Sequence, residues 1–275
     1  MKIYAIKDEE TVKNKTLAYL FYHENSCRFF IEIPSDADEW EVPLILSSFV
    51  HRKIYFVDSY WAGKWVMNRI VPPDRQNLGM ILKKEGLKEY DIHKLLALTS
   101  GRCSHDSCYI ERIDHTELPK EIQLKLTHKL RDIMPLDHRM ALALFKDGTI
   151  KMIDFIRITG YLDSEQKERL ERIINRPDLF SGMNIVPGGN GVEWSEQNNV
   201  HAELLYEHGT AMPFSFSDLS NYIENRLVDT SEACLILGCS RQYINQLVKD
   251  VKLTPVRSEG NNRLFLRSDV NEVGE

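Results

Sequence analysis

The sequence predicts an α+β protein of two small mixed α/β domains, followed by a C-terminal unit of short helices and a hairpin. Short runs of alternating apolar residues near the N-terminus predict strands, because alternate residues of a strand face the same side of a sheet. An Asp-Gly pair between two apolar runs in the middle of the chain predicts a hairpin. Near the C-terminus, the apolar spacing changes to that of two short helices. The expected parts are residues 1–115, 116–207, a linker over 208–227, and 228–275.

Length and composition are typical of a soluble globular protein with two or three domains. The 275 residues are 43% hydrophobic, and the mean hydropathy is -0.35. Five cysteines without dense spacing indicate a reducing compartment and not a disulfide framework. We recognise no signal peptide and no apolar run of membrane-spanning length, so we expect a cytoplasmic protein without a membrane partner. The net charge of -6 argues against a protein that binds nucleic acid through its overall charge.

The first domain, Met1 to about His115, is predicted to open with a three-stranded meander. Its alternating runs predict strands over residues 2–6, 16–22, 27–33 and 53–57. Helical spacing predicts helices over residues 36–51, 75–85 and 90–99, and a further helix directly after Asp58. Ser35 and Asp58 are expected N-caps, because a side-chain oxygen at that position accepts hydrogen bonds from the free amides of the first turn.

Two groups of side chains in this domain could either pack in the fold or bind a ligand or DNA. Tyr60, Trp61 and Trp65 follow Asp58 at helical spacing, and we expect them in the core. Basic residues around the two later helices are expected on a solvated helix face rather than on DNA. They are Arg69, Arg75, Lys83, Lys84 and Lys88.

One cluster has residue types that bind metals, namely Cys103, His105, Asp106 and Cys108. A structural zinc site usually closes with a second pair of ligands, which is not evident in the sequence. A nucleophilic cysteine would need a positioned base and an orienting group, and neither is recognised. We therefore expect a polar loop with one buried cysteine, no metal and no cofactor. Without an acid/base pair or a phosphate loop elsewhere, an enzyme is the least favoured class.

The second domain is predicted to begin with an amphipathic helix over residues 118–131 that bridges the two domains. Apolar runs over 133–145 and 150–155 flank the Asp147-Gly148 turn and predict a hairpin. Farther along we expect a helix over 164–175 and a second hairpin, with strands near 183–186 and 192–194. The Gly-rich loop Pro187 to Gly191 lacks the Lys-Ser/Thr ending of a phosphate-binding loop, so we interpret it as the turn of that hairpin.

Parts of this domain resemble the bacterial domain of unknown function 2442. The resemblance rests on MPLDHRMALALFKDGTIKMIDF, from Met134, and NGVEWSEQNNVHAELLY, which ends at Tyr206. It implies a small α+β fold of a kind often encoded beside toxin and antitoxin pairs. It supplies no catalytic residues.

The segment from Asp229 to Val270 predicts two short helices followed by a hairpin. Ala233, Ile236 and Leu237 form an apolar stripe on the first helix, and Gly238 ends that helix. Ser240 is the expected cap of a second helix over 241–249, whose Ile244, Leu247 and Val248 point inward. The alternating run over 256–266 predicts a hairpin with Gly260, Asn261 and Asn262 at its tip.

This segment resembles the excisionase and MerR-type winged helix family. The matching stretches are TSEACLILGCSRQYINQLVKD, LTPVR and NNRLFLRSDV. The resemblance implies a C-terminal winged helix-turn-helix that binds double-stranded DNA by sequence. Arg, Gln and Asn side chains on such a reading helix can form paired hydrogen bonds with base edges, and basic residues near the wing suit phosphates. The candidate DNA-binding residues are Ser240, Arg241, Gln242, Tyr243, Asn245, Gln246, Lys249, Arg257, Asn262, Arg263 and Arg267.

Charge leaves a second function open. Residues 226–275 hold seven Lys or Arg and seven Asp or Glu, a net charge of zero, whereas an autonomous DNA-binding domain is usually basic. We place the acidic residues on the first helix and the tail, and the basic ones on the reading helix and the wing. Double-stranded DNA is the first expected partner. The alternative is a protein-interaction or antitoxin-like adaptor that binds a protein through the first two domains. A homodimer would also need those domains, because no segment is expected after the wing.

Overall fold

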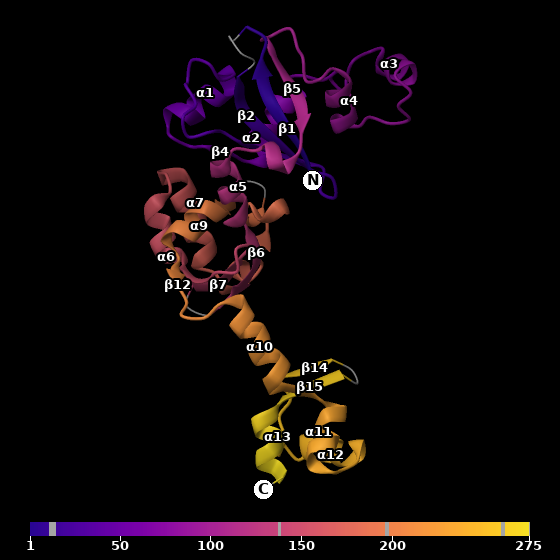
Figure 1. The fold of residues 1–275 in the computed structure, drawn as a ribbon, viewed down its shortest axis with the longest axis vertical. Helices are drawn as coiled ribbons and strands as arrows, with labels where there is room; N and C mark the ends of the chain where they lie inside the picture. The colour runs from indigo at the N-terminus through magenta and orange to yellow at the C-terminus, as the bar shows by residue number, and fades with distance from the viewer. Residues whose placement is uncertain (11–14, 137–138, 196–197, 260–261, 275) are drawn as a thin grey trace. The chain divides into compact units, whose positions relative to one another are not determined.

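The computed structural model describes residues 1–10, 15–136, 139–195, 198–259 and 262–274. It confirms the α+β class, because helices alternate with sheets whose strand pairs are antiparallel (Figure 1). The chain forms two compact units. The first contains Met1–Asp147 and Ile153–Gly209, so both predicted N-terminal domains are lobes of one unit. The second contains Gly148–Met152 and Thr210–Glu275.

The N-terminal lobe is built on a five-stranded sheet in the order β4-β3-β2-β1-β5. Its strands are β1 Lys2–Asp8, β2 Thr16–His23, β3 Arg28–Glu32, β4 Phe56–Val57 and β5 Cys108–Ile113. The predicted three-stranded meander is therefore confirmed. Strand β5 was not expected, and it pairs antiparallel with β1 although about a hundred residues separate them in sequence.

Both faces of this sheet are buried, because apolar side chains occupy consecutive positions of its central strands. In β3, Phe29 and Ile31 belong to the core on one face, whereas Phe30 belongs to the core on the other face. The first face packs against α1 Leu44–His51, α2 Ser59–Met67 and α4 Ile92–Leu98. The second face packs against Ile122 of α5 Lys120–Thr127. Figure 1 shows α5 between the sheet and the lobe that carries α7 and α9.

The helices of this lobe are shorter than predicted. Helix α1 begins at Leu44 and not at residue 36, because Pro43 disfavours a helical conformation in the residue before it. Asp38 accepts a hydrogen bond from the backbone of Trp40, a local contact that competes with a helix. The Asp58 cap is confirmed, since its side chain accepts from the amide of Trp61 at 3.1 Å. The two later helices are α3 Leu78–Lys84 and α4.

The prediction that Tyr60 and Trp61 lie in the core is wrong. Only Trp65 of the three aromatic residues is buried, at 1% exposure, whereas Tyr60 is 52% and Trp61 43% exposed. The buried face of α2 is set by Ala62, Trp65 and Val66 at i, i+3 and i+4. Because residues 60 and 61 lie off that stripe, their side chains leave the core.

Arg69 is not on a solvated face as predicted, because it is only 5% exposed and binds the Cys103–Cys108 loop. Its guanidinium forms a two-pronged ion pair with Asp106 and lies 4.0 Å from the Trp65 ring centre. Burial, followed by the Asp106 charge, raises the pKa of Cys108 to about 12, so this thiol stays protonated. In the described part of the chain, no three His, Cys, Asp or Glu residues are placed to hold a metal ion.

The middle lobe contains two further sheets, a hairpin sheet and a short sheet beside the Gly-rich loop. The strands are β6 Leu130–Pro135, β7 Met140–Phe145 and β8 Ile150–Asp154, then β9 Asn184–Ile185, β10 Gly191–Ser195 and β11 Asn198–His201. The helices are α6 Phe155–Ile158, α7 Ser164–Ile174, α8 Pro177–Phe180 and α9 Ala202–His208. Short 3-10 turns cover His115–Glu117, Thr159–Tyr161 and Pro187–Gly189. The predicted strand over 133–145 is two strands, and the predicted helix over 118–131 ends at Thr127, because Leu130 begins β6.

The two lobes of the first unit are joined by ionic and aromatic contacts. Arg28 of β3 donates to both carboxylate oxygens of Glu193 in β10, at 2.8 and 2.9 Å. Lys129 donates to Glu32 at 2.6 Å, and both side chains are buried. The His201 ring meets Phe56 edge to face, with 4.5 Å between ring centres. Burial first, and then the Lys129 charge, lower the pKa of His201 to about 4.

This lowered pKa predicts a loss of stability in mild acid. The unfolded chain takes up the His201 proton near pH 6.5, whereas the folded chain takes it up only near pH 4, so protons favour unfolding across that window. In the unchanged chain, we expect His201 to lower the free energy of unfolding by about 2 to 3 kcal/mol between pH 7 and pH 4.5. In His201→Gln this contribution should be absent. Urea unfolding at both pH values measures this change in the free energy of unfolding. The matched control is His105→Gln, at an exposed histidine. An unchanged pH dependence in His201→Gln would contradict the assignment.

The second unit begins where β12 Thr210–Ala211 pairs with Lys151 and Met152 of β8. The expected linker over 208–227 therefore contains a strand, and it also contains helix α10 Phe216–Arg226, which Ser215 caps. The remaining elements are β13 Leu227–Asp229, α11 Thr230–Leu237, α12 Arg241–Lys249, β14 Arg257–Glu259, β15 Asn262–Leu266 and α13 Arg267–Gly274. Helix α13 follows the hairpin, where no further segment was predicted. No helix among the described residues is both long and apolar enough to cross a membrane.

Candidate nucleic-acid interface

A tight turn fixes the geometry of α11 and α12. Asp229 accepts from the amides of Ser231 and Glu232, at 2.6 and 2.8 Å, and Glu232 accepts from the amide of Asp229, so a capping box starts α11. Gly238 ends the helix with a φ of 61°, a left-handed conformation that a residue without Cβ adopts at little cost. The predicted helix end is therefore confirmed, and the chain reverses into α12 within two residues.

Helix α12 has one apolar and one polar face, as predicted. The Ser240 side chain caps it by accepting from the amide of Tyr243 at 3.3 Å. Ile244 and Leu247 are buried against a core that includes Phe265, which is fully buried in β15. Because this packing anchors one side of the helix, the opposite side is held rigidly at the surface. The exposed residues on or beside it are Ser240, Arg241, Gln242, Tyr243, Asn245, Gln246 and Lys249.

Contacts orient several of these exposed side chains. Arg241 donates to the Ser231 hydroxyl of α11 at 2.8 Å, so its guanidinium is directed by the first helix. Gln246 donates to Asp250 at 2.8 Å, one turn farther along α12. Sequence reasoning did not name Ser231 or Asp250. The i+4 spacing of Gln246 and Asp250 was a signal that could have identified that pair.

The hairpin β14–β15 lies beside α12 and is tied to it by Arg263. Arg263 donates to the Asn245 side chain at 2.6 Å, and Ser258 is its cross-strand partner. The tip residues Gly260 and Asn261, and the side chain of Asn262, lie outside the described residues. The Arg263–Asn245 contact thus joins two candidate residues that are eighteen positions apart in sequence.

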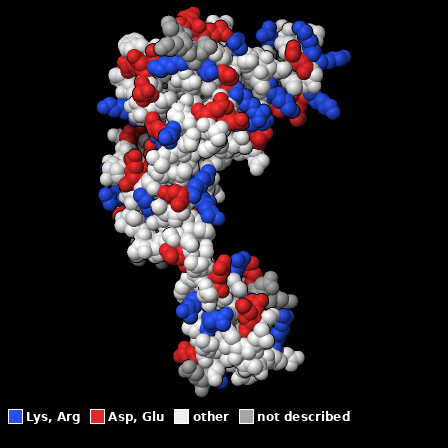
Figure 2. Space-filling model, in the orientation of Figure 1, with Lys and Arg blue, Asp and Glu red and all other residues white. Residues whose placement is uncertain are grey.

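Arg267 does not lie near the wing tip with the other basic candidates. Arg267 is the first residue of α13, at the far end of β15, and donates to the carbonyl of Asn225 in α10. The predicted segregation of charge is also wrong. Asp250 ends α12, and Glu259 lies in β14, where it pairs with Arg257 at 2.8 Å. Figure 2 shows red and blue atoms interspersed on the visible face of this unit.

No family model, curated protein or solved structure matches this chain.

Proposed function

We propose that this protein is a sequence-specific DNA-binding protein, a cytoplasmic transcriptional regulator of a bacterial or mobile-element operon. The observation that carries the proposal is the polar face of α12, where Arg241, Gln242 and Gln246 stand exposed on a helix anchored from behind by Ile244 and Leu247. Helix, tight turn, helix and hairpin follow in the order of a winged helix-turn-helix. A rigid helix of this size enters the major groove with its first residues at the base edges.

Different positions give the polar residues different tasks in this proposal. Gln242 lies in the first turn of α12 and can reach a base edge with both ends of its amide. Arg263 is bound to Asn245, so it fixes the hairpin against α12. Hairpin residues in such an arrangement mostly contact phosphates, which carry no base information.

The test compares substitutions on α12 with one on the hairpin. Gln242→Ala should weaken binding to a selected duplex by about 1 to 3 kcal/mol and relax the preference at one base pair. Arg257→Ala should weaken binding to all sequences alike and lower the slope of log affinity against log salt by about one. The site is first selected from random duplexes, and binding isotherms are then recorded on selected and scrambled duplexes at several salt concentrations.

Asn271→Ala, an exposed substitution on α13, is the matched control and should leave affinity and preference unchanged. Ser231→Ala should reproduce part of an Arg241→Ala effect, since it removes only the group that orients the guanidinium. If Arg241→Ala and Gln242→Ala change neither affinity nor preference in a folded protein, α12 does not read DNA.

One observation favours a second function, an adaptor that binds protein. The C-terminal fifty residues have no net charge. A surface without net charge suits a protein interface better than a phosphate backbone. If the protein is an adaptor, no duplex should be enriched from the random pool at physiological salt. The selection experiment therefore distinguishes the two functions.

A further inference from the structure

Two adjoining cavities lie between the lobes of the first unit, far in sequence from the proposed DNA-binding helix. Their volumes are about 350 and 170 Å³, and both are lined by Asp58, Tyr60, Asn199 and Val200. The two cavities therefore share a wall, and we call them together the interlobe cleft. The larger cavity alone is in the size range of pockets that bind small molecules.

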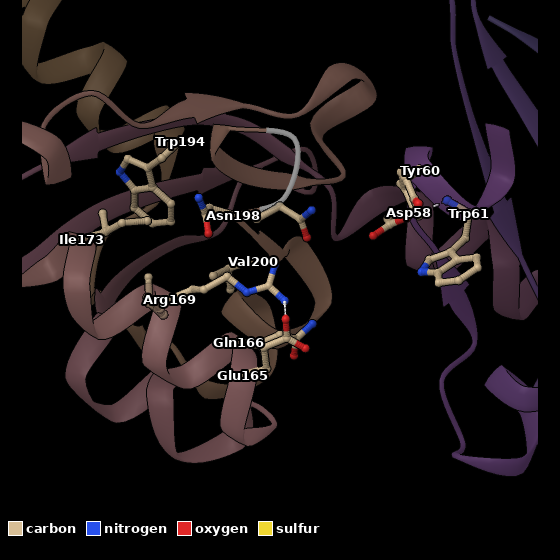
Figure 3. A pocket seen from close by; sticks show the side chains of 12 residues that line it. Asp58, Tyr60, Trp61, Glu165, Gln166, Arg169, Ile173, Trp194, Asn198 and Val200 are labelled. Carbon is tan, nitrogen blue, oxygen red and sulfur yellow. Dashed lines mark hydrogen bonds and ion pairs between the residues drawn. The ribbon is translucent and has the colours of Figure 1, made fainter. Parts of the chain in front are cut away.

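Aromatic side chains stand on both walls of the interlobe cleft. Tyr60 and Trp61 come from α2 of the N-terminal lobe, and Trp194 comes from β10 of the middle lobe (Figure 3). The Trp194 indole N–H is already bonded to the Phe180 carbonyl at 3.0 Å, so this ring is fixed in place. Tyr60 and Trp61 are about half exposed on a helix whose other aromatic residue is fully buried. Such rings in a concave site provide surfaces on which a ligand can stack.

Charge in the cleft is negative once the internal ion pairs are considered. Arg169 pairs with Glu165 at 2.7 Å (Figure 3). Arg28 pairs with Glu193 at 2.8 Å, so both guanidinium groups have carboxylate partners. Asp58 remains. Within the described ranges, no basic side chain is within ion-pair distance of its carboxylate. The cleft therefore disfavours anions and favours a cation.

The Asn198 side chain provides a second acceptor in the cleft, and this one has no hydrogen-bond partner. The Asn198 amide nitrogen donates to the Ser195 hydroxyl at 2.8 Å, but its buried amide oxygen has no hydrogen-bond partner. A buried acceptor without a donor carries a desolvation cost that a ligand N–H can remove. The Asp58 carboxylate and the Asn198 amide oxygen can therefore both accept hydrogen bonds from a ligand.

We propose that the interlobe cleft binds a small organic cation of the guanidinium class. A guanidinium is planar, carries one positive charge and presents five N–H donors, so it can bind a carboxylate and an amide oxygen while stacking on an indole or phenol ring. A quaternary ammonium would satisfy the charge and the rings but would leave the Asn198 oxygen without a donor. A neutral sugar would leave the Asp58 charge without a partner.

The test titrates the full-length chain, without DNA, with butylguanidinium and with butylurea, its neutral isostere. Isothermal calorimetry should show saturable one-to-one binding of butylguanidinium, with butylurea at least about tenfold weaker. Asp58→Asn should weaken butylguanidinium binding at least about tenfold while α2 keeps its cap, because Asn is as good an N-cap as Asp. Trp61→Leu should also weaken binding.

Trp40→Leu is the matched control, because Trp40 is 88% exposed and does not line the cleft. The Trp40→Leu variant should bind butylguanidinium with the same affinity as the unchanged chain. Three results would each overturn the proposal: no saturable binding at tens of millimolar butylguanidinium, equal binding of the two probes, or full affinity in a folded Asp58→Asn variant. DNA is absent from this experiment, so its outcome is independent of the proposed regulator function.

Discussion

Lys129→Met is expected to lower the free energy of unfolding by about 3 to 5 kcal/mol, because it leaves the Glu32 carboxylate buried without a counter-ion. Glu32 is 2% exposed and Lys129 6%, and their charged atoms are 2.6 Å apart. The ammonium also lies 4.4 Å from the centre of the Phe56 ring. The second oxygen of Glu32 has no hydrogen-bond partner, so the carboxylate depends on Lys129 for its compensation.

Chemical denaturation of the single and double variants measures this effect. Glu32→Met combined with Lys129→Met should recover most of the lost stability, since two apolar side chains of similar length replace the whole ion pair. Lys15→Met is the control, because Lys15 forms its ion pair with Glu41 at the surface, where the two side chains are 47% and 40% exposed, and its loss should cost under about 1 kcal/mol. A double variant less stable than Lys129→Met alone would show that the loss comes from packing and not from an unpaired charge.

Gly189→Ala is expected to cost about 3 to 5 kcal/mol, from backbone strain and a steric clash together. Gly189 has a φ of +80°, and a Cβ there would lie 2.0 Å from the carbonyl oxygen of Leu130. The adjacent Gly188 carbonyl accepts from the Lys146 side chain at 2.7 Å. The Gly-rich loop therefore packs tightly against β6, which supports its interpretation as a structural turn.

Thermal and urea unfolding of Gly189→Ala test this expectation against Gly63→Ala. Gly63 lies inside α2 with no atom near the position of a new Cβ. Its replacement should stabilise the helix by about 0.5 to 1 kcal/mol. If Gly189→Ala unfolds at the same denaturant concentration as the unchanged chain, the loop is free to move away from β6 and the close approach is not required.

The C-terminal unit was the part best predicted from the sequence, because its signals are local. Gly238, the Ser240 cap and the stripe of Ile244 and Leu247 act over one or two turns of helix. The helix over residues 241–249 therefore has the predicted bounds. The contact between Arg263 and Asn245 could not be predicted in the same way, because it depends on how the hairpin lies against α12.

The sequence by itself determined the α+β class, the N-terminal meander, the caps at Asp58 and Ser240, and the two faces of α12. These features follow from side-chain periodicity and from hydrogen bonds between near neighbours. Only the tertiary structure decided that Arg69 is buried against Asp106, that Trp61 faces a cleft and that Lys129 compensates Glu32. Each of these pairs or cavities joins segments distant in sequence. A residue pattern specifies which side of an element is apolar, whereas the partner of a buried charge depends on which elements the fold brings together.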